Sequence, residues 1–550
     1  MRRTLAAWVA WLRGLSNFER FLLVATVFGA CLHVSLFWLG RVLWDGGSYA
    51  YIGGGFSRTG AFAVEWDPDG SYPLWEFGVL YPAYLAVFYS AFGVGVAATK
   101  TAAVAASVLA IWVGYATTRN LFDRTKGLVV AALVSLDVTL LRANYHNYAE
   151  PFLLLLIVPA FWALLKGLKD SRYMLAFGFF AGLFYLSKTI IGWSFLVVGA
   201  AALLVWRWYH VRGRLWRDPH WFGGVAILLA FVGIREAIVE ASGRTVETHG
   251  LGYGLGQPDL FLPILAAKLP FLVLLLAVWG GYWLPELWRA LRRRREPEMG
   301  ILWLSIAGVA GATWVLISVI ALTEPHNPLF WQDNLRYTSI LAVPIMWLAF
   351  RETDLRSGGG SWLPRVSRKR LAAFAAAAAV AVVSLLVVGF WLAAFLVVAA
   401  LALLYPSPRK RVVLIVVVFA VMGTNAVTLV DQPAFIEAAG ALNVHLWPGD
   451  VVAIDRHVLP NLNPEQLYIY VEVREIEVTW YNESLNTTFI MSQVPWGSDI
   501  VYDGYTRLGS FASASERTIL SRILAGLSGG EGSADRHVVN LWQLNSTLTR

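Results

Sequence analysis

A succession of long apolar runs constrains this chain more than any other feature of its sequence. The runs recur from residue 21 to residue 430, and 57% of the 550 residues are hydrophobic whereas only 15% are charged. An α-helix needs about 20 apolar residues to cross the hydrocarbon core of a bilayer. The sequence therefore predicts a polytopic α-helical membrane protein. The first run, 21–39, is too long for the core of a cleaved signal peptide and is expected to remain as the first span.

About thirteen runs are expected to be spans, and the shorter ones need amphipathic flanking residues to reach across the membrane. One further apolar run, 79–92, would break the alternation of basic loops if it were a span, so we expect it to lie along or dip into the outer surface as a helix. The expected spans are 21–39, 101–118, 128–141, 151–165, 173–186, 189–206, 221–239, 269–284, 301–322, 339–350, 371–388, 390–404 and 412–430.

Lys and Arg residues set the expected orientation, because cytoplasmic loops are enriched in both. With the runs counted this way, basic clusters fall in every second connection, on the same side as the basic N-terminus: 119–126, 166–172, 207–217, 289–295, 351–370 and 409–411. An odd number of spans places the tail after residue 430 outside. Three N-glycosylation sequons, beginning at Asn482, Asn486 and Asn545, occur only in that tail, which agrees with the count. We expect the protein to lie in the plasma membrane.

Charge and cysteine content exclude several other classes. The net charge of +8 collects at the ends of apolar runs, as membrane orientation requires, so no nucleic-acid partner is expected. The single cysteine, Cys31, lies inside the first apolar run, which rules out an intrachain disulfide and a cysteine-based metal site.

The division into domains follows a change of composition near residue 430. Residues 1–430 form the expected membrane domain, with a long outer loop at 41–100, and residues 431–550 form a small soluble α/β domain. Segments 451–455, 467–481 and 537–542 are rich in β-branched and aromatic residues and predict strands, whereas 515–527 has helical spacing. This domain is better suited to covering a site or receiving an acceptor than to chemistry.

Polar and charged residues recur in successive outer loops and are scarce inside the spans. Ionisable groups at membrane depth are costly and persist mainly where they line a cavity or pair with one another. Lys188 lies between two apolar runs with no acidic neighbour in sequence, and a lipid phosphate is a natural counter-ion for it. The candidate site residues on these loops are Asp45, Tyr49, Asp67, Asp69, His146, Glu150, Lys188, His326, Asn334 and Arg336.

Each candidate also has an ordinary structural interpretation. Asp45 could cap a surface helix, and Glu150, which precedes Pro151, could be a first-turn helix acid. Asp67-Pro68-Asp69-Gly70 is strong turn chemistry, which we favour over a metal-binding carboxylate pair. His146 could be interfacial, and Lys188 or Arg336 could extend to lipid headgroups.

Five short segments, taken in order, resemble the GT-C superfamily of membrane glycosyltransferases, in the branch of protein O-mannosyltransferases and aminoarabinose transferases. Trp44-Asp45-Gly-Gly-Ser-Tyr49 resembles the aspartate motif of the family's first loop. The segment 80–84 resembles its surface helix. The other three segments are 142–151, which carries an acid, 182–188, which ends in a Ser-Lys step, and Arg336-Tyr337 at the start of a later span. Glu76 is followed by Phe77-Gly78 where the family often has Lys-Pro-Pro, so the phosphate contact of that lysine falls to Lys188 or Arg336.

The resemblance implies a GT-C-like membrane domain that transfers a sugar, a hexose such as mannose, from a polyprenyl-phosphate or dolichyl-phosphate donor to an acceptor hydroxyl with inversion. The acceptor would be a lipid, a glycan or a protein. Such a reaction needs a base for the acceptor and cations for the departing phosphate. Asp45 is the implied base, Glu150 orients a cation or the acceptor, and Lys188, Arg336 and His326 bind the phosphate. Tyr49, His146 and Asn334 are expected to bind substrate. No cofactor is required, although Asp67 and Asp69 leave a divalent metal open.

Two other classes stay open on the sequence alone. A lipid or sugar transporter would need polar groups deep in its spans, and this chain has few. A non-catalytic assembly subunit would have the same spans with an inert outer face.

Overall fold

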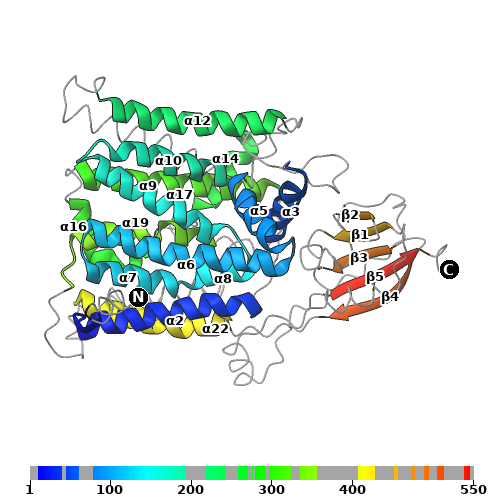
Figure 1. The fold of residues 1–550 in the computed structure, drawn as a ribbon, viewed down its shortest axis with the longest axis horizontal. Coiled ribbons are helices and arrows are strands. Elements are labelled where there is room, and N and C mark those ends of the chain that lie inside the picture. Colours follow the sequence, from blue (N-terminus) through cyan, green and yellow to red (C-terminus); the bar gives the residue numbers. More distant parts are fainter. Residues whose placement is uncertain are drawn as a thin grey trace.

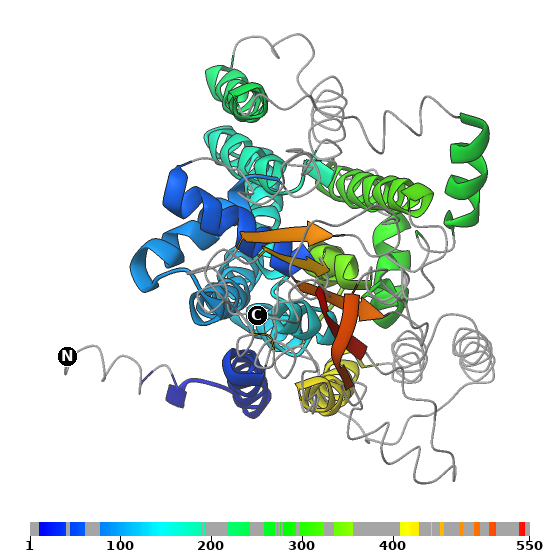
Figure 2. The same ribbon diagram turned by 90° about the vertical axis from the view of Figure 1, so that its right-hand side faces the viewer.

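The computed structural model describes residues 10, 12–39, 45–60, 78–189, 191–192, 218–241, 258–269, 272, 276, 279–292, 297–323, 335–355, 407–427, 442, 451–455, 472–476, 489–494, 505–512 and 538–544. Long helices run side by side through the membrane domain, and a sheet lies beyond one end of them (Figure 1). The short helices α3 (Asp45–Thr59) and α5 (Leu80–Phe92) lie at that same end. Figure 2 looks onto this end, with the strands in front of the helices.

The remaining helices follow in chain order. They are α2 (Asn17–Leu39), α6 (Val96–Leu121), α7 (Arg124–Ser135), α8 (Val138–His146), α9 (Glu150–Gly167), α10 (Tyr173–Ser187), α12 (Pro219–Ala241), α14 (Pro258–Ala267), α16 (Leu284–Arg292), α17 (Pro297–Thr323), α19 (Thr338–Arg351) and α22 (Pro408–Val427), with short 3₁₀ turns η2 (Gly281–Trp283) and η3 (Leu335–Tyr337).

The described helices bear out a polytopic membrane protein. Within these residues, five helices are long and apolar enough to cross a membrane, and a bent pair makes a sixth: α2, α6, α9, α12, α17, and α7 with α8. The expected spans 371–388 and 390–404, and most of 189–206, lie outside the described residues. The count of about thirteen therefore stays a prediction.

The apolar run 128–141 is expected to be one span, and the structure divides it into two helices that together are long and apolar enough to cross a membrane. Helix α7 ends at Ser135 and α8 begins at Val138, with an angle of 49° between them. Asp137 lies at the break, where its carboxylate accepts hydrogen bonds from the backbone N–H of Thr139 at 2.9 Å and from its hydroxyl at 2.7 Å. A buried carboxylate that accepts from the first backbone N–H groups of a helix acts as its N-cap. It therefore favours the start of α8 at this point over continuation of α7. After the break, α8 runs in a different direction from α7 and ends at His146.

Helix α5 corresponds to the apolar run 79–92. Its 13 residues are too short to span a bilayer at 1.5 Å per residue, which fits the expected surface helix. One face of α5, with Tyr81, Leu85 and Tyr89, is buried. The backbone of α5 also approaches α3 closely, because a Cβ on Gly53 would lie 2.8 Å from the carbonyl oxygen of Pro82. The two helices form one short layer at the end of the bundle.

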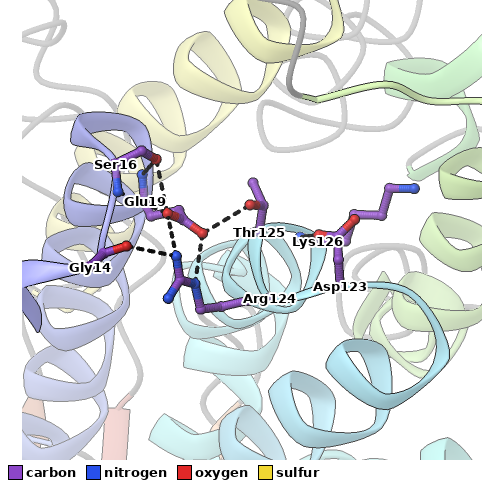
Figure 3. A network of polar contacts seen from close by, with 7 residues as sticks. All are labelled: Gly14, Ser16, Glu19, Asp123, Arg124, Thr125 and Lys126. Carbon is purple, nitrogen blue, oxygen red and sulfur yellow. Dashed lines mark hydrogen bonds and ion pairs between the residues drawn. The ribbon is translucent and has the colours of Figure 1, made fainter. Parts of the chain in front are cut away.

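The opposite end of the bundle is held by a polar network around Glu19 (Figure 3). The carboxylate of Glu19 accepts hydrogen bonds from Arg124 Nε at 2.9 Å, Arg124 Nη2 at 3.0 Å and the hydroxyl of Thr125 at 3.0 Å. Asp123 caps α7 through the N–H of Lys126, whose Nζ donates to the carbonyl of Phe350. This network joins the first helix to α7 and α19.

A buried ion pair joins α16 to α22 at the same end and provides a test of the packing. Glu286 and Arg411 are each 1% exposed, and Arg411 also donates to the carbonyl of Tyr282 at 3.1 Å. Removing one partner of a buried pair leaves an uncompensated charge, so Arg411→Met is expected to lower the free energy of unfolding by about 3–5 kcal/mol. Thermal unfolding of the purified protein in detergent measures this loss.

The matched control uses the second arginine on the same carboxylate. Arg289 lies 3.0 Å from Glu286, but its side chain is 51% exposed. Arg289→Gln is expected to cost less than about 1 kcal/mol. Equal losses in the two variants would show that burial is not the source of the effect.

The described strands form one mixed sheet in the order β2-β1-β3-β5-β4. They are β1 (Val451–Asp455), β2 (Glu472–Ile476), β3 (Phe489–Val494), β4 (Tyr505–Ala512) and β5 (Val538–Leu544). β1 pairs in parallel with β2 and β3, in registers that place Val452 opposite Val473 and Phe489, and β5 is antiparallel to β3 and β4. β1, β2 and β5 fall within or overlap the predicted strands, β3 and β4 were not predicted, and the predicted helix 515–527 lies outside the described residues.

Candidate active site

The start of α5 is fixed to the end of α10. The backbone N–H of Val79 donates to the carbonyl of Leu186 at 2.8 Å. Gly78 has a φ of +64°, and a Cβ there would lie 2.5 Å from the carbonyl oxygens of Leu186 and Ser187. Only glycine tolerates both this backbone conformation and this approach. The contact holds the start of α5 against the last turn of α10, which Lys188 follows.

The start of α3 is fixed in the same way to the loop between α8 and α9. A Cβ on Gly46 would lie 2.1 Å from the carbonyl oxygen of His146, so no side chain fits at this position. The amide of Asn147 donates to the carbonyl of Gly46 at 3.3 Å. Asp45 is the first residue of α3 and precedes Gly46 directly. The candidate base therefore begins a helix whose first turn lies against the loop that carries His146 and Glu150.

Asn147 ends α8 in the left-handed conformation, with φ 62° and ψ 34°. The N–H of Tyr148 bonds the carbonyl of Ala143 at 2.8 Å, and the N–H of Asn147 bonds that of Asn144 at 3.2 Å. These two bonds form a Schellman motif, for which asparagine is the usual substitute for glycine. The hydroxyl of Tyr81 donates to the side-chain oxygen of Asn147 at 3.3 Å. Burial raises the pKa of Tyr81 well above its ordinary value, so this hydroxyl keeps its proton.

Glu150 and Arg336 form a nearly buried ion pair next to this loop. Glu150 is the first residue of α9, where an acid is favourable to the helix dipole and Pro151 to the first turn. Its Oε1 lies 3.2 Å from Nε of Arg336 in η3, with side chains 4% and 10% exposed. The guanidinium carbon of Arg336 lies 3.9 Å from the centroid of the Tyr148 ring. The pair and the stacking together fix the guanidinium in one place.

Lys188 approaches the same place from the end of α10. Its side chain is buried, and Nζ lies 5.7 Å from the centroid of the Tyr337 ring. The guanidinium carbon of Arg336 lies 5.2 Å from that same ring. Two cations therefore adjoin one tyrosine, beside the carboxylate of Glu150. Such a site suits an anion that has several oxygen atoms.

Two further predicted residues pack against tyrosines near these groups. The ring of His146 is buried between Tyr145, edge-on at 4.9 Å, and Tyr148, stacked at 5.2 Å between centroids. Tyr49, which is 2% exposed, packs edge-on against Tyr81 at 4.9 Å. Both belong to the aromatic packing that supports the ends of α3 and α8.

The other predictions fall on parts of the chain that the structure does not describe. These are Asp67, Asp69, His326, Asn334 and the side chain of Asp45. In the described part, no group of three or more His, Cys, Asp and Glu residues could hold a metal ion. Sequence reasoning missed Asn147 and Tyr148, which no charge or periodic pattern distinguishes. It mentioned Tyr81 and Tyr337 only as parts of resembling segments.

These features define a class: a polytopic helical membrane protein in which two cations and an acid lie together where several helices end. Residues 78–234 match the family model described as Dolichyl-phosphate-mannose-protein mannosyltransferase. The crystal structure of ArnT from Cupriavidus metallidurans in the apo state is similar over 99% of both chains, with a TM-score of 0.52 and 16% sequence identity. The crystal structure of ArnT from the same organism bound to undecaprenyl phosphate is similar over 97% of this chain and 98% of that chain. Its TM-score is 0.50 and its sequence identity is 17%.

No curated protein sequence matched the chain. The family model and the structural likeness confirm the resemblance that the sequence motifs suggested. Residues 78–234 therefore resemble that mannosyltransferase family, and the chain has the fold of the two ArnT structures.

Proposed function

We propose that this protein transfers a sugar, a hexose such as mannose, from a polyprenyl-phosphate or dolichyl-phosphate donor to an acceptor hydroxyl at the outer membrane face. The observation that carries the proposal is the convergence of Lys188 and Arg336 on Tyr337, beside Glu150. A lipid-linked phosphate is an anion that matches two cations at membrane depth. The undecaprenyl phosphate bound by ArnT from Cupriavidus metallidurans supports a donor of this class.

The proposed roles follow from the charge that develops during transfer. The donor phosphate is already a good leaving group, so the reaction needs cations for the departing oxygen and a base for the acceptor. Lys188 and Arg336 take the first role, with His326 as a hydrogen-bond donor, and Asp45 takes the second. Glu150 orients Arg336 through the 3.2 Å ion pair. Attack of the acceptor in a single step inverts the anomeric centre.

The remaining candidates are assigned either to substrate binding or to a divalent metal site. Tyr49, His146 and Asn334 would contact the sugar or the acceptor, which is a lipid, a glycan or a protein. If a divalent metal takes part, Asp67 and Asp69 would supply its carboxylate ligands. This assignment rests on the carboxylate pair in the sequence.

The proposed orientation places the N-terminus in the cytoplasm and the site and C-terminal sheet outside the plasma membrane. The basic loops and the sequons of the tail support it. The sheet lies beyond the end of the bundle that carries α3 and α5, which is the end where the candidate site forms (Figure 1). This arrangement supports a C-terminal domain that covers the site or receives an acceptor.

The test is a donor panel applied to the purified full chain in lipid nanodiscs. Radiolabelled mannosyl, glucosyl and aminoarabinosyl polyprenyl phosphates are offered, and both free polyprenyl phosphate and sugar products are measured. We expect one donor to be consumed and Asp45→Asn to suppress its consumption. Binding without consumption of any donor, with or without an acceptor hydroxyl, would indicate an assembly subunit. Movement of intact donor across a proteoliposome membrane would indicate a flippase.

A further inference from the structure

Asn147 links three elements that are distant in the sequence, and it is completely buried. It ends α8, its side-chain oxygen accepts from Tyr81 of α5, and its side-chain nitrogen donates to Gly46 of α3. Gly46 and Asn147 are 101 positions apart, and Tyr81 and Asn147 are 66 positions apart. Asparagine can meet all three demands, and the Tyr81 hydroxyl also lies 3.4 Å from the backbone carbonyl oxygen of Asn147.

The reason lies in the chemistry of the carboxamide. Glycine would accept the left-handed backbone at this position but would make neither side-chain bond. Aspartate would accept the Tyr81 proton, but it could not donate to the carbonyl of Gly46 and would bring a negative charge against it. An amide supplies one acceptor and one donor in the same plane, which are what Tyr81 and Gly46 require.

The last turn of α8 is also supported by a residue of α6. Lys100 of α6 is 1% exposed, and its Nζ donates to the carbonyl of Tyr145 at 2.6 Å. Carbonyls in the last turn of a helix lack partners within the helix, and a cation is favourable there. The last turn of α8 is therefore held by Lys100 of α6 as well as by the Asn147 bonds.

We propose that Asn147 is a positioning residue that holds the start of α3, and with it Asp45, at a fixed distance from Glu150 and Arg336. The inference rests on the proposed function, in which Asp45 is the base. Gly46 follows Asp45 directly, and its backbone touches the carbonyl of His146 so closely that a shift of the turn must shift α3. The donor cations lie on other elements, since Lys188 follows α10 and Arg336 belongs to η3.

The test compares Asn147→Gly and Asn147→Asp with the wild type in transfer to an acceptor. Misplacing a reacting group by about 1 Å can cost about 10²-fold in rate. We expect kcat to fall about 10- to 100-fold while donor affinity changes less than about threefold. Tyr81→Phe removes the second bond and is expected to lower kcat less. Tyr84→Phe is the matched control on the same helix, because the hydroxyl of Tyr84 bonds Ala102 and does not reach Asn147.

A second comparison separates positioning from general support of the fold. In the Asp45→Asn background there is no base to position, so Asn147→Gly is expected to lower kcat by less than about twofold further, since residues that act as a unit are not additive. Equal losses in both backgrounds would overturn the inference, as would a kcat for Asn147→Gly within twofold of the wild type. Parallel loss of donor affinity and kcat would also overturn it.

The outcomes distinguish this inference from the proposed function. If the wild type consumes no donor, the proposed function fails. If the wild type is active and the Asn147 variants keep its rate, only the positioning role fails. If Asn147→Gly does not fold in a thermal unfolding assay, the comparison of kcat between Tyr81→Phe and Tyr84→Phe decides the question. Equal kcat values in these two variants would reject the positioning role of Asn147.

Discussion

Asp45→Asn is expected to lower the rate of sugar transfer by about 10²- to 10⁴-fold, the usual effect of removing a general base. Asparagine keeps the size and the hydrogen-bonding reach of aspartate but cannot take the proton from an acceptor hydroxyl. Folding and donor binding are expected to persist, because Lys188 and Arg336 lie on other elements. Initial rates of transfer, with donor affinity measured separately, check this result.

Three further variants serve as controls for the assignment of the base. Glu150→Gln is expected to cost less than Asp45→Asn if Glu150 only orients Arg336, and more if the two acids have exchanged roles. Asp67→Asn and Asp69→Asn are expected to have small effects. A collapse of activity in either that added divalent metal restores would favour a metal-assisted site. Near wild-type transfer by Asp45→Asn would leave Asp45 as the residue that starts α3.

Arg336→Met and Lys188→Met have the second-largest expected effects. Methionine keeps the bulk of each side chain and removes its charge. Loss of one charge-assisted contact to phosphate costs about 1.5–3 kcal/mol, which corresponds to about 10- to 150-fold in donor affinity or in turnover. Equilibrium binding of radiolabelled polyprenyl phosphate measures the first quantity, and transfer rates measure the second.

The matched control for this pair of variants is a lysine at the surface. Lys169 is 69% exposed and pairs with Glu298 at 3.2 Å, so Lys169→Met is expected to leave donor affinity unchanged within about twofold. If Lys188→Met and Arg336→Met both behave like Lys169→Met, the two cations extend to lipid headgroups and do not bind the donor. Loss in only one of them would identify the residue that holds the phosphate.

The sequence by itself predicted a polytopic helical membrane protein and pointed to the residues that could carry charge at its outer loops. A run of about 20 apolar residues is a local property, so helices such as α6, α9 and α17 could be expected from composition alone. Pro151 after Glu150 marked the start of α9, because proline is tolerated at the first helical position. Lys188 and Arg336 stood out because isolated cations beside apolar runs are rare.

Only the tertiary structure decided which helix ends meet. The Glu150–Arg336 pair and the bond from Asn147 to Gly46 join residues far apart in the chain, and no spacing rule predicts them. The break at Asp137 depends on a cap that this one acid makes within an otherwise largely apolar run. Asn147 carries no charge and fits no periodic pattern, and its importance appears only when α3, α5 and α8 pack together. Local periodicity specifies helices, whereas long-range packing specifies the site, because a site is made from side chains and backbone groups of several elements.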